Sequence, residues 1–332
     1  MKYTKNALNI LTAKSYKGIG NAWLIKNLKG NEDIDAIVAL LNNKIKEKTT
    51  VAEFEHLRTG FEEKLIQKFE DCCDGFVALG DNDFPQYRGI VKDSEQPVFL
   101  YYKGDIDLLS IENKNVTVIG LLNPESDIED RERNIVAEFV KHGATIVSGL
   151  AFGCDSISHK ETLDRNGKTV AILPSPLNDI LPGRNKGLAY QIVEEGGLIV
   201  TEYGTDFKSK MELSSRYKER DRLQALFCDT IVLAASYAKD SAQRWNMFGQ
   251  KLDSGARLAM EYAKEYNIQR AVMYDRNLDE NNPMFDLNRD LIKEQNDITI
   301  ITNNNIYETV NKLLLKNSTI KNKKAIQGNL FD

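Results

Sequence analysis

The chain has 332 residues, of which 42% are hydrophobic, so it can bury one substantial core and carry a smaller module beside it. Its 44 Lys and Arg residues are outnumbered by 49 Asp and Glu residues. The resulting formal net charge of −5 excludes a protein that coats nucleic acid through a generally basic surface. Any contact with nucleic acid must therefore come from a local basic patch.

The sequence has no feature of an exported or membrane-embedded protein. No apolar run approaches the roughly 18 to 20 residues that a membrane-spanning helix needs, and the N-terminus lacks the apolar core of a signal peptide. The four cysteines have neither metal-ligand spacing nor the pattern of a disulfide framework, so we interpret them as small buried side chains. We expect a cytoplasmic protein that contains no metal site and contacts no membrane.

Residues 1–70 are predicted to form a small helical module, because their apolar residues recur at helical spacing and strand signals are few. Gly18-Ile19-Gly20 lies between two helical stretches, as in a helix-hairpin-helix, where glycines let backbone N–H groups approach a phosphate. A tight turn between two helices, which needs a positive φ angle, explains the same residues and is the interpretation we favour.

From about residue 75 the chain alternates short β-branched runs with helical stretches, which is typical of βαβ units in a parallel sheet. The runs are almost continuously apolar, as expected for strands covered on both faces. The sequence therefore predicts an α/β fold, an extended Rossmann-type parallel sheet over residues 75–305. The expected strands are 116–119, 145–147, 169–173, 198–201, 230–234, 270–273 and 298–301. The expected helices are 129–141, 155–166, 187–195, 220–227 and 255–265.

The loops that follow the strands form the candidate binding site. Ligands of parallel α/β sheets lie at the carboxyl ends of the strands, where helix N-termini attract anions. Gly120 follows the first of these strands, and Ser148, Gly149 and Gly153 follow the second, where glycine permits close backbone approach. Because these loops match neither the dinucleotide-binding glycine pattern nor a Walker A loop, we expect no nicotinamide cofactor and no ATP hydrolysis.

Cations gather after the strand at 198–201. Lys218, Arg220 and Arg222 are the members of this group that we expect to contact phosphate. The alternative is a solvated polar stretch that opens a helix. A second basic stretch, 239–251, contains Trp245 and Phe248, and an aromatic ring beside cations can stack a nucleic-acid base. Packing of these two rings on one helix face is the simpler interpretation.

An acid–base pair is the one catalytic arrangement that the sequence suggests. His159 lies about one helical turn after Asp155, so the two side chains are on neighbouring helix positions. No nucleophile and no set of metal ligands accompanies them. We therefore expect no catalytic residue and no cofactor.

A series of short motifs runs in a fixed order through roughly residues 1 to 300. The series comprises Asp83-Phe84-Pro85, Pro97-Val98-Phe99-Leu100-Tyr101-Tyr102-Lys103-Gly104, Gly120, Ser148-Gly149-Leu150-Ala151, Gly153, Asp155, His159, Leu177-Asn178-Asp179, Asn185, Gly197-Leu198-Ile199-Val200-Thr201-Glu202-Tyr203, Arg220-Asp221-Arg222-Leu223 and Ser254-Gly255. This ordered series resembles the DNA-processing protein A (DprA/Smf) family. The resemblance implies a helical module before an extended Rossmann domain, single-stranded-DNA binding, loading of a recombinase, and a role in natural transformation or related recombination, often as a homodimer.

Two positions depart from the family's pattern. Leu122 stands where the family usually has the arginine of a Gly-Ser/Thr-Arg motif, and Phe152 replaces the arginine of Ala-Arg-Gly. Two cations are thus missing from the expected phosphate pocket, whereas Arg220 and Arg222 are retained. The residues expected to bind DNA phosphate are Gly120, Ser148, Gly149, Gly153, Lys218, Arg220, Arg222, Ser254 and Gly255.

Residues 316–332 are predicted to be a disordered basic tail, because they are polar and aperiodic. Near its end, Gln327-Gly328-Asn329-Leu330-Phe331 resembles the Gln-x-x-Leu-Phe peptide with which many bacterial replication and repair proteins dock on the polymerase sliding clamp. The Gln327 amide would form hydrogen bonds, and Leu330 and Phe331 would fill an apolar pocket. A frayed terminus with two accidental apolar residues is the alternative.

Three classes of function remain open at this point. Single-stranded-DNA binding without catalysis is the leading one. A sensor or hydrolase of a nucleotide-derived ligand is the second, since related Rossmann families use the same strand-end loops. The third is an adaptor that joins a sliding clamp to DNA in defence or mobile-element biology.

Overall fold

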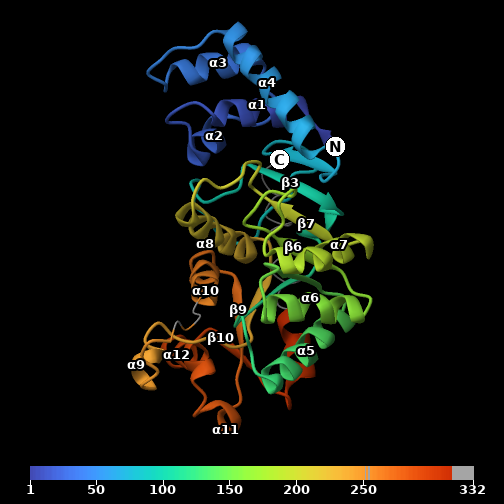
Figure 1. The fold of residues 1–332 in the computed structure, drawn as a ribbon, viewed down its shortest axis with the longest axis vertical. Coiled ribbons are helices and arrows are strands. Elements are labelled where there is room, and N and C mark those ends of the chain that lie inside the picture. The colour runs from blue at the N-terminus through green and yellow to red at the C-terminus, as the bar shows by residue number, and fades with distance from the viewer. Residues whose placement is uncertain (251, 253–254, 316–332) are drawn as a thin grey trace, which may run out of the picture.

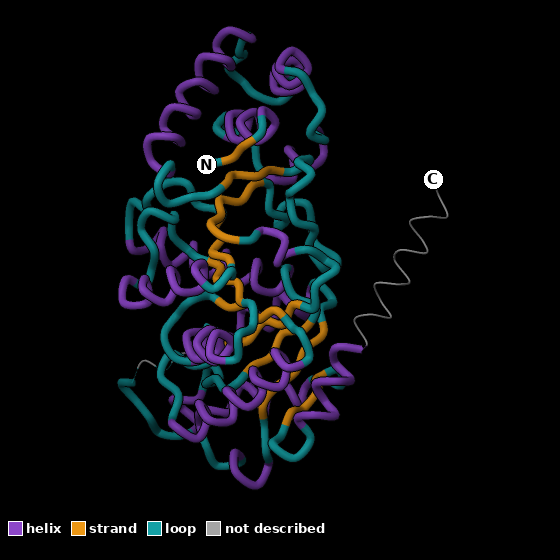
Figure 2. The backbone as a smooth tube through the Cα atoms, turned by 90° about the vertical axis from the view of Figure 1, so that its right-hand side faces the viewer, coloured by secondary structure: helices purple, strands orange, loops and turns teal. Residues whose placement is uncertain are grey.

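The computed structural model describes residues 1–250, 252 and 255–315. Figure 1 shows an elongated molecule with the N-terminal helices at one end and the sheet running from beneath them to the other end. In Figure 2 the strands form a twisted column along the long axis, and helices flank it on both sides. The fold is therefore a layered α/β arrangement, as the sequence predicted.

The strands form one sheet in the order β1-β2-β3-β7-β6-β5-β4-β8-β9-β10. From β7 to β10 all neighbours are parallel. All seven strands expected from the sequence form, each within one residue of its expected bounds at either end. They are β4 (Asn115–Ile119), β5 (Thr145–Ser148), β6 (Thr169–Ile172), β7 (Leu198–Thr201), β8 (Thr230–Leu233), β9 (Gln269–Met273) and β10 (Ile298–Ile301).

Three strands that the sequence analysis did not identify extend the sheet beyond β7. They are β1 (Lys2–Tyr3), β2 (Gly75–Ala78) and β3 (Phe99–Gly104). β3 is antiparallel to both β2 and β7, so the βαβ rhythm used to find the other strands does not apply to it. β1 has only two residues, which is too short for a recognisable pattern.

Four helices occupy the first 69 residues, namely α1 (Lys5–Lys14), α2 (Asn21–Asn27), α3 (Ile34–Asn42) and α4 (Val51–Phe69). Thr50 and Glu53 form a reciprocal capping box at the start of α4. Gly18 has a φ of 90° in the turn between α1 and α2, which fits the favoured tight-turn interpretation. The apolar side chains of these helices pack in one cluster with β2 and β3, so the proposed boundary between residues 70 and 75 crosses a shared core.

The longer of the remaining helices cover the faces of the sheet. α8 begins at Lys210 and not at the expected residue 220, because Ser209 caps the helix by accepting a hydrogen bond from the Glu212 N–H. The cationic segment before Arg220 is therefore helical. Further helices are α5 (Ser126–Lys141), α6 (Cys154–Asp164), α7 (Lys186–Glu194), α9 (Ser241–Arg244), α10 (Ala256–Glu265), α11 (Arg276–Asp279), α12 (Asp286–Glu294) and residues 306–315.

A buried ion pair links α11 to α5. The two guanidinium nitrogens of Arg131 donate to the two carboxylate oxygens of Asp279 at 2.8 and 2.7 Å, and both side chains are buried. Removing one member of such a pair leaves an uncompensated buried charge, which is far more costly than losing an exposed pair.

Asp279→Ala is therefore expected to lower the free energy of unfolding by about 3–5 kcal/mol in urea titrations. The matched control is Glu280→Ala, which breaks the exposed pair with Arg276 and should cost less than about 1 kcal/mol. Adding Arg131→Met to Asp279→Ala should cost much less than the sum of the single changes. Additive effects, within about 0.5 kcal/mol, would contradict the coupling.

Candidate functional site

The loops after β4 and β5 are packed against each other through two glycines. A Cβ on Gly120 would lie 2.5 Å from Cys154 Sγ, and a Cβ on Gly153 would lie 2.1 Å from the Leu121 carbonyl oxygen. Gly153 also has a φ of 66°, which side chains disfavour. These two expected site residues thus allow close packing of the loops, which places the loop residues Leu122 and Phe152 at adjoining positions.

The anion-binding groups of the β5–α6 loop are already occupied by a side chain of the protein. The carboxylate of Asp155 accepts hydrogen bonds from the N–H groups of Gly149 and Ala151, at 3.1 and 3.2 Å. The Arg220 Nη1 atom lies 3.5 Å from the same carboxylate oxygen. Asp155 is therefore in the place where a phosphate would be expected at the start of a helix after a glycine-rich loop.

Arg220 and Arg222 are both buried. Arg220 lies so close over Gly149 that a Cβ at that position would be 1.1 Å from Nη1. Arg222 donates to both carboxylate oxygens of Glu202, at 2.8 and 2.9 Å. Burial lowers the pKa of Arg222, but the Glu202 carboxylate outweighs this and the net shift is upward. Both arginines hold the strand-end loops in place, and a phosphate could reach them only if these contacts opened.

The other expected site residues have different positions. The Ser148 hydroxyl donates to the Val118 carbonyl at 2.7 Å and so ties β5 to β4. Lys218 is exposed on α8, and Gly255 is the residue before α10. Ser254 lies outside the described residues.

His159 faces β6 and not Asp155. Its Nδ1 atom is 2.6 Å from the Thr169 hydroxyl, and the ring is buried. Burial, with a smaller contribution from Arg220, lowers the pKa of His159 to about 3. The imidazole is therefore neutral near pH 7, and its placement gives no acid–base pair. No group of three or more potential metal ligands occurs in the part of the chain that the structure describes.

Two large apolar side chains at the outer edge of these loops are exposed to solvent. Leu122 is 46% exposed and Phe152 is 39% exposed, although both are large and apolar. The Asn185 amide donates to the carbonyls of Leu150 and Ala151, at 2.8 and 3.2 Å, and so fixes the start of α7 beside Phe152.

Two cations flank that contact. Arg184 and Lys186 immediately precede and follow Asn185 and are exposed. Within the described residues, neither forms an ion pair with a carboxylate. Sequence reasoning missed both, although a usable signal was their position between the strand at 169–173 and the helix at 187–195. We call the surface formed by Leu122, Phe152, Arg184 and Lys186 the strand-end face.

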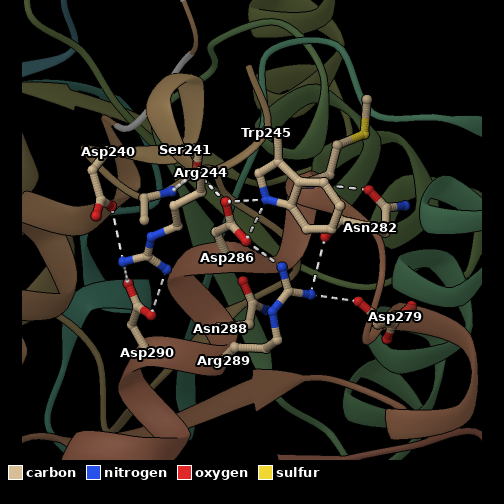
Figure 3. A network of polar contacts seen from close by, with 12 residues as sticks. Asp240, Ser241, Arg244, Trp245, Asp279, Asn282, Asp286, Asn288, Arg289 and Asp290 are labelled. Atoms are coloured by element: carbon tan, nitrogen blue, oxygen red, sulfur yellow. Dashed lines mark hydrogen bonds and ion pairs between the residues drawn. The ribbon is translucent and has the colours of Figure 1, made fainter. Parts of the chain in front are cut away.

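Trp245 is fixed by hydrogen bonds in the segment after β8. Figure 3 shows the buried Asp286 carboxylate between the Trp245 indole and the Arg289 guanidinium. The indole N–H donates to Asp286 at 2.9 Å, and Arg244 joins Asp240 to Asp290. The simpler interpretation, in which Trp245 and Phe248 pack on one helix face, is wrong because α9 ends at Arg244. Phe248 is 71% exposed.

The segment from β2 to the last helix matches a known family. The model of the family described as DNA recombination-mediator protein A matches residues 75–311. The chain belongs to this family. The match confirms the resemblance seen in the ordered motifs, and it covers strands β2 to β10 and all the strand-end loops. In the part of the chain that the structure describes, no helix has the length and apolar character needed to cross a membrane.

Individual relatives agree with this assignment. Protein Smf of Synechocystis is 31% identical over 194 residues, which is 58% of this chain and 44% of the relative. DNA processing protein DprA of Streptococcus pneumoniae is 29% identical over 171 residues, covering 52% of this chain and 56% of the relative. The chain thus spans about half the length of these relatives.

Two solved structures share the fold. The structure of DprA from Streptococcus pneumoniae covers 93% of this chain and 98% of its own, with a TM-score of 0.66 and 22% identity. DNA processing protein A from Helicobacter pylori, studied for its single-stranded DNA binding mode, covers 70% of this chain and 98% of its own, with a TM-score of 0.53 and 26% identity.

The depressed pKa of His159 predicts a pH dependence of stability. The folded chain holds this ring neutral, whereas the unfolded chain binds a proton below about pH 6.5, so acid stabilises the unfolded state. Between pH 7 and pH 5 this residue alone should remove about 2 kcal/mol of unfolding free energy. The loss would continue toward the folded pKa of about 3.

His159→Gln should flatten this dependence in urea titrations at pH 7 and pH 5. His56→Gln, at an exposed site on α4, is the matched control and should retain the wild-type slope. Equal pH slopes in wild type and His159→Gln would show that the ring is not held neutral by burial.

Proposed function

We propose that the chain binds single-stranded DNA through the strand-end face. The observation that carries this proposal is the exposed Phe152 ring beside Arg184 and Lys186, which have no carboxylate partner among the described residues. Aromatic rings that stack bases, together with cations that follow the backbone, are what single-strand binders use. A duplex hides the faces of its bases, so the ring favours a single strand.

The replacement of two family arginines changes how this face would bind. Leu122 and Phe152 offer apolar contacts where the family usually has cations, so base stacking takes a larger share of the affinity and phosphate contact a smaller one. The chain's net charge of −5 agrees with a local, partly apolar site. Contact of Lys218, which is exposed on α8, with phosphate stays a prediction.

The buried Arg220 and Arg222 hold the loops of the strand-end face in position. Contact of Arg220 and Arg222 with phosphate, expected from the sequence, stays a prediction, and their ion pairs with Asp155 and Glu202 favour a positioning role. Gly120, Ser148, Gly149 and Gly153 act in the same way, because they allow or fix the packing of the loops. Gly255, the residue before α10, and Ser254, which lies outside the described residues, remain proposed contacts.

Family membership extends the proposal to a biological role. The family's description as a recombination mediator and the single-strand binding of the Helicobacter pylori protein both support DNA processing and recombination, natural transformation included. On this basis we propose that the chain acts in the cytoplasm as a homodimer, without a cofactor, and delivers single-stranded DNA to a recombinase.

A sensor or hydrolase of a nucleotide-derived ligand is the second candidate. It is disfavoured because Asp155 already occupies the N–H groups that would hold the ligand's phosphate. Steady hydrolysis of a nucleotide that is abolished by Asp155→Asn would favour this candidate over DNA binding. An adaptor that joins DNA to a sliding clamp is compatible with the strand-end face and depends on the tail.

Replacing residues of the strand-end face should abolish most of the single-strand affinity. The variant Phe152→Ala, Arg184→Ala, Lys186→Ala loses one stacking contact, worth roughly 1–3 kcal/mol, and two phosphate contacts. Its slope of log affinity against log salt should fall by about 0.7 for each lost phosphate contact. Fluorescence anisotropy with a labelled single strand at several salt concentrations measures both quantities.

Lys160→Ala is the matched control, because Lys160 is an exposed cation on α6 away from the strand ends. It should leave affinity and salt slope unchanged. If the triple variant folds and binds single-stranded DNA as tightly as the wild type, the strand-end face is not the binding site.

The tail motif supplies a separate proposal. Gln327, Leu330 and Phe331 lie outside the described residues, so the proposal depends on the sequence alone. We propose that they dock on a polymerase sliding clamp, as a short linear motif that needs no folded scaffold.

A free peptide of residues 323–332 should therefore compete with the whole protein for the clamp. Burial of the two apolar anchors is worth roughly 1.5–3 kcal/mol each, so Leu330→Ala with Phe331→Ala should weaken binding by well over tenfold. Asn329→Ala, inside the motif but not an anchor, is the control. Anisotropy that detects no clamp binding by the wild-type peptide would refute the motif. Binding that survives the double change would mean that the lysines of the tail mediate it.

A further inference from the structure

A groove of about 1240 Å³ lies between the N-terminal helices and the β3–β7 side of the sheet. One wall comes from α1 and α4, and the opposite wall comes from α8, α10 and the loop after β7. Figure 1 shows α1 and α4 above β3, with α8 and α10 below them. The floor contains Phe99 and Tyr101 of β3. Of the residues expected from the sequence to bind phosphate and described by the structure, Arg222 alone lines this groove.

Charge is distributed unequally between the two walls. Lys14, Lys64 and Lys68 lie on the α1 and α4 wall, whereas Glu202 and Glu219 lie on the opposite wall, and Glu95 is a third carboxylate of the lining. Arg222 pairs with Glu202 and neutralises it. The groove is thus cationic along one side and carries hydrogen-bond acceptors along the other.

Lys14 is the most enclosed of these cations. Its ammonium donates to the Asn21 side-chain oxygen and lies 5.4 Å from the centre of the Phe99 ring. Burial lowers the pKa of Lys14. Within the described residues, neither Lys14 nor Lys64 forms an ion pair with a carboxylate. Lys68 pairs with the exposed Asp206, a contact that water screens and that an anionic ligand could replace.

Partly exposed aromatic rings line the same groove. Phe61 comes from the lysine-bearing wall, and Tyr203 and Tyr262 come from the opposite wall. Tyr203 is held in place because its hydroxyl donates to Glu219 at 2.7 Å and the Arg216 guanidinium lies 4.4 Å from its ring centre. Rigid rings of this kind are suited to base stacking.

The groove adjoins the strand-end face. Glu202 and Tyr203 follow β7 directly, at the same carboxyl edge of the sheet that carries the strand-end face. α8 reaches both sites, because its Arg220 lies against the β5–α6 loop and its Glu219 lines the groove. A chain bound at the strand ends therefore meets the groove without crossing the body of the protein.

We propose that this groove holds a second stretch of the same DNA single strand. The phosphates lie along Lys14, Lys64 and Lys68, and the bases face the opposite wall. There Glu219 can accept hydrogen bonds from exocyclic amino groups, such as that of cytosine. This inference rests on the proposed function and extends the DNA path from the strand-end face onto the helical module.

The test compares oligonucleotides of two lengths. A single strand of about 6 nucleotides covers the strand-end face, and one of about 16 nucleotides also reaches the groove, both within the range of single-strand sites. The variant Lys14→Met, Lys64→Met removes two charges and keeps the apolar stems. It should bind the short strand as tightly as the wild type does. The gain, which is the higher affinity of the wild type for the long strand than for the short one, should be lost in the variant. Its salt slope on the long strand should fall by about 0.7 for each lost phosphate contact.

Lys46→Met, in the same helical module but outside the groove, is the matched control and should retain the gain. A folded Lys14→Met, Lys64→Met variant that keeps the full gain for the long strand overturns the groove proposal, whereas a wild type that binds neither strand overturns the proposed function. If the variant does not fold, ultraviolet cross-linking of the wild type to the long strand decides. Cross-links at Phe61 or Tyr203 support the groove, and cross-links confined to 149–153 and 183–186 overturn it.

Discussion

The contact of Arg220 with Gly149 and Asp155 determines the geometry of the strand ends. The guanidinium occupies the space that any side chain at residue 149 would need, and Asp155 uses the loop's N–H groups. An anion-binding loop is thus filled by the protein's own carboxylate and closed by a buried arginine. In the proposed binding mode the ligand contacts therefore lie further out, where Phe152, Arg184 and Lys186 are exposed.

This proposed mode explains how an acidic protein can bind an anionic polymer. At the strand-end face and along the α1 and α4 wall of the groove, cations of the described chain lie in the same site as exposed or partly exposed aromatic rings. Elsewhere many Lys and Arg side chains are used in ion pairs, as Arg131 is with Asp279. Local arrangement, and not net charge, therefore decides where phosphate is attracted.

The parallel part of the fold could be predicted because its strands are short, apolar and β-branched and alternate with helices. β1 to β3 could not, since β1 is too short and β3 pairs antiparallel on both sides, outside that rhythm. The site was only partly predictable. The sequence located the strand-end loops, but charged residues are rarely buried, so nothing in it indicated that Arg220 and Arg222 are enclosed.

The departures at Leu122 and Phe152 were visible in the sequence, whereas their exposure was not. A large apolar residue in a loop is as compatible with a buried anchor as with an exposed contact, and only the packing of Gly120 and Gly153 decides between them. The groove was also beyond sequence reasoning, because Lys14 and Glu219 are far apart in the chain and line the same groove only in the folded structure.

The most direct test of the account is the affinity of the wild-type chain for a single-stranded oligonucleotide and for the same sequence as a duplex, measured by anisotropy from low to high salt. We predict clearly tighter binding of the single strand. We also predict that this preference persists as salt rises, because base stacking is screened less than phosphate contact. Equal affinity for both forms, or no binding of the single strand at low salt, would contradict the account.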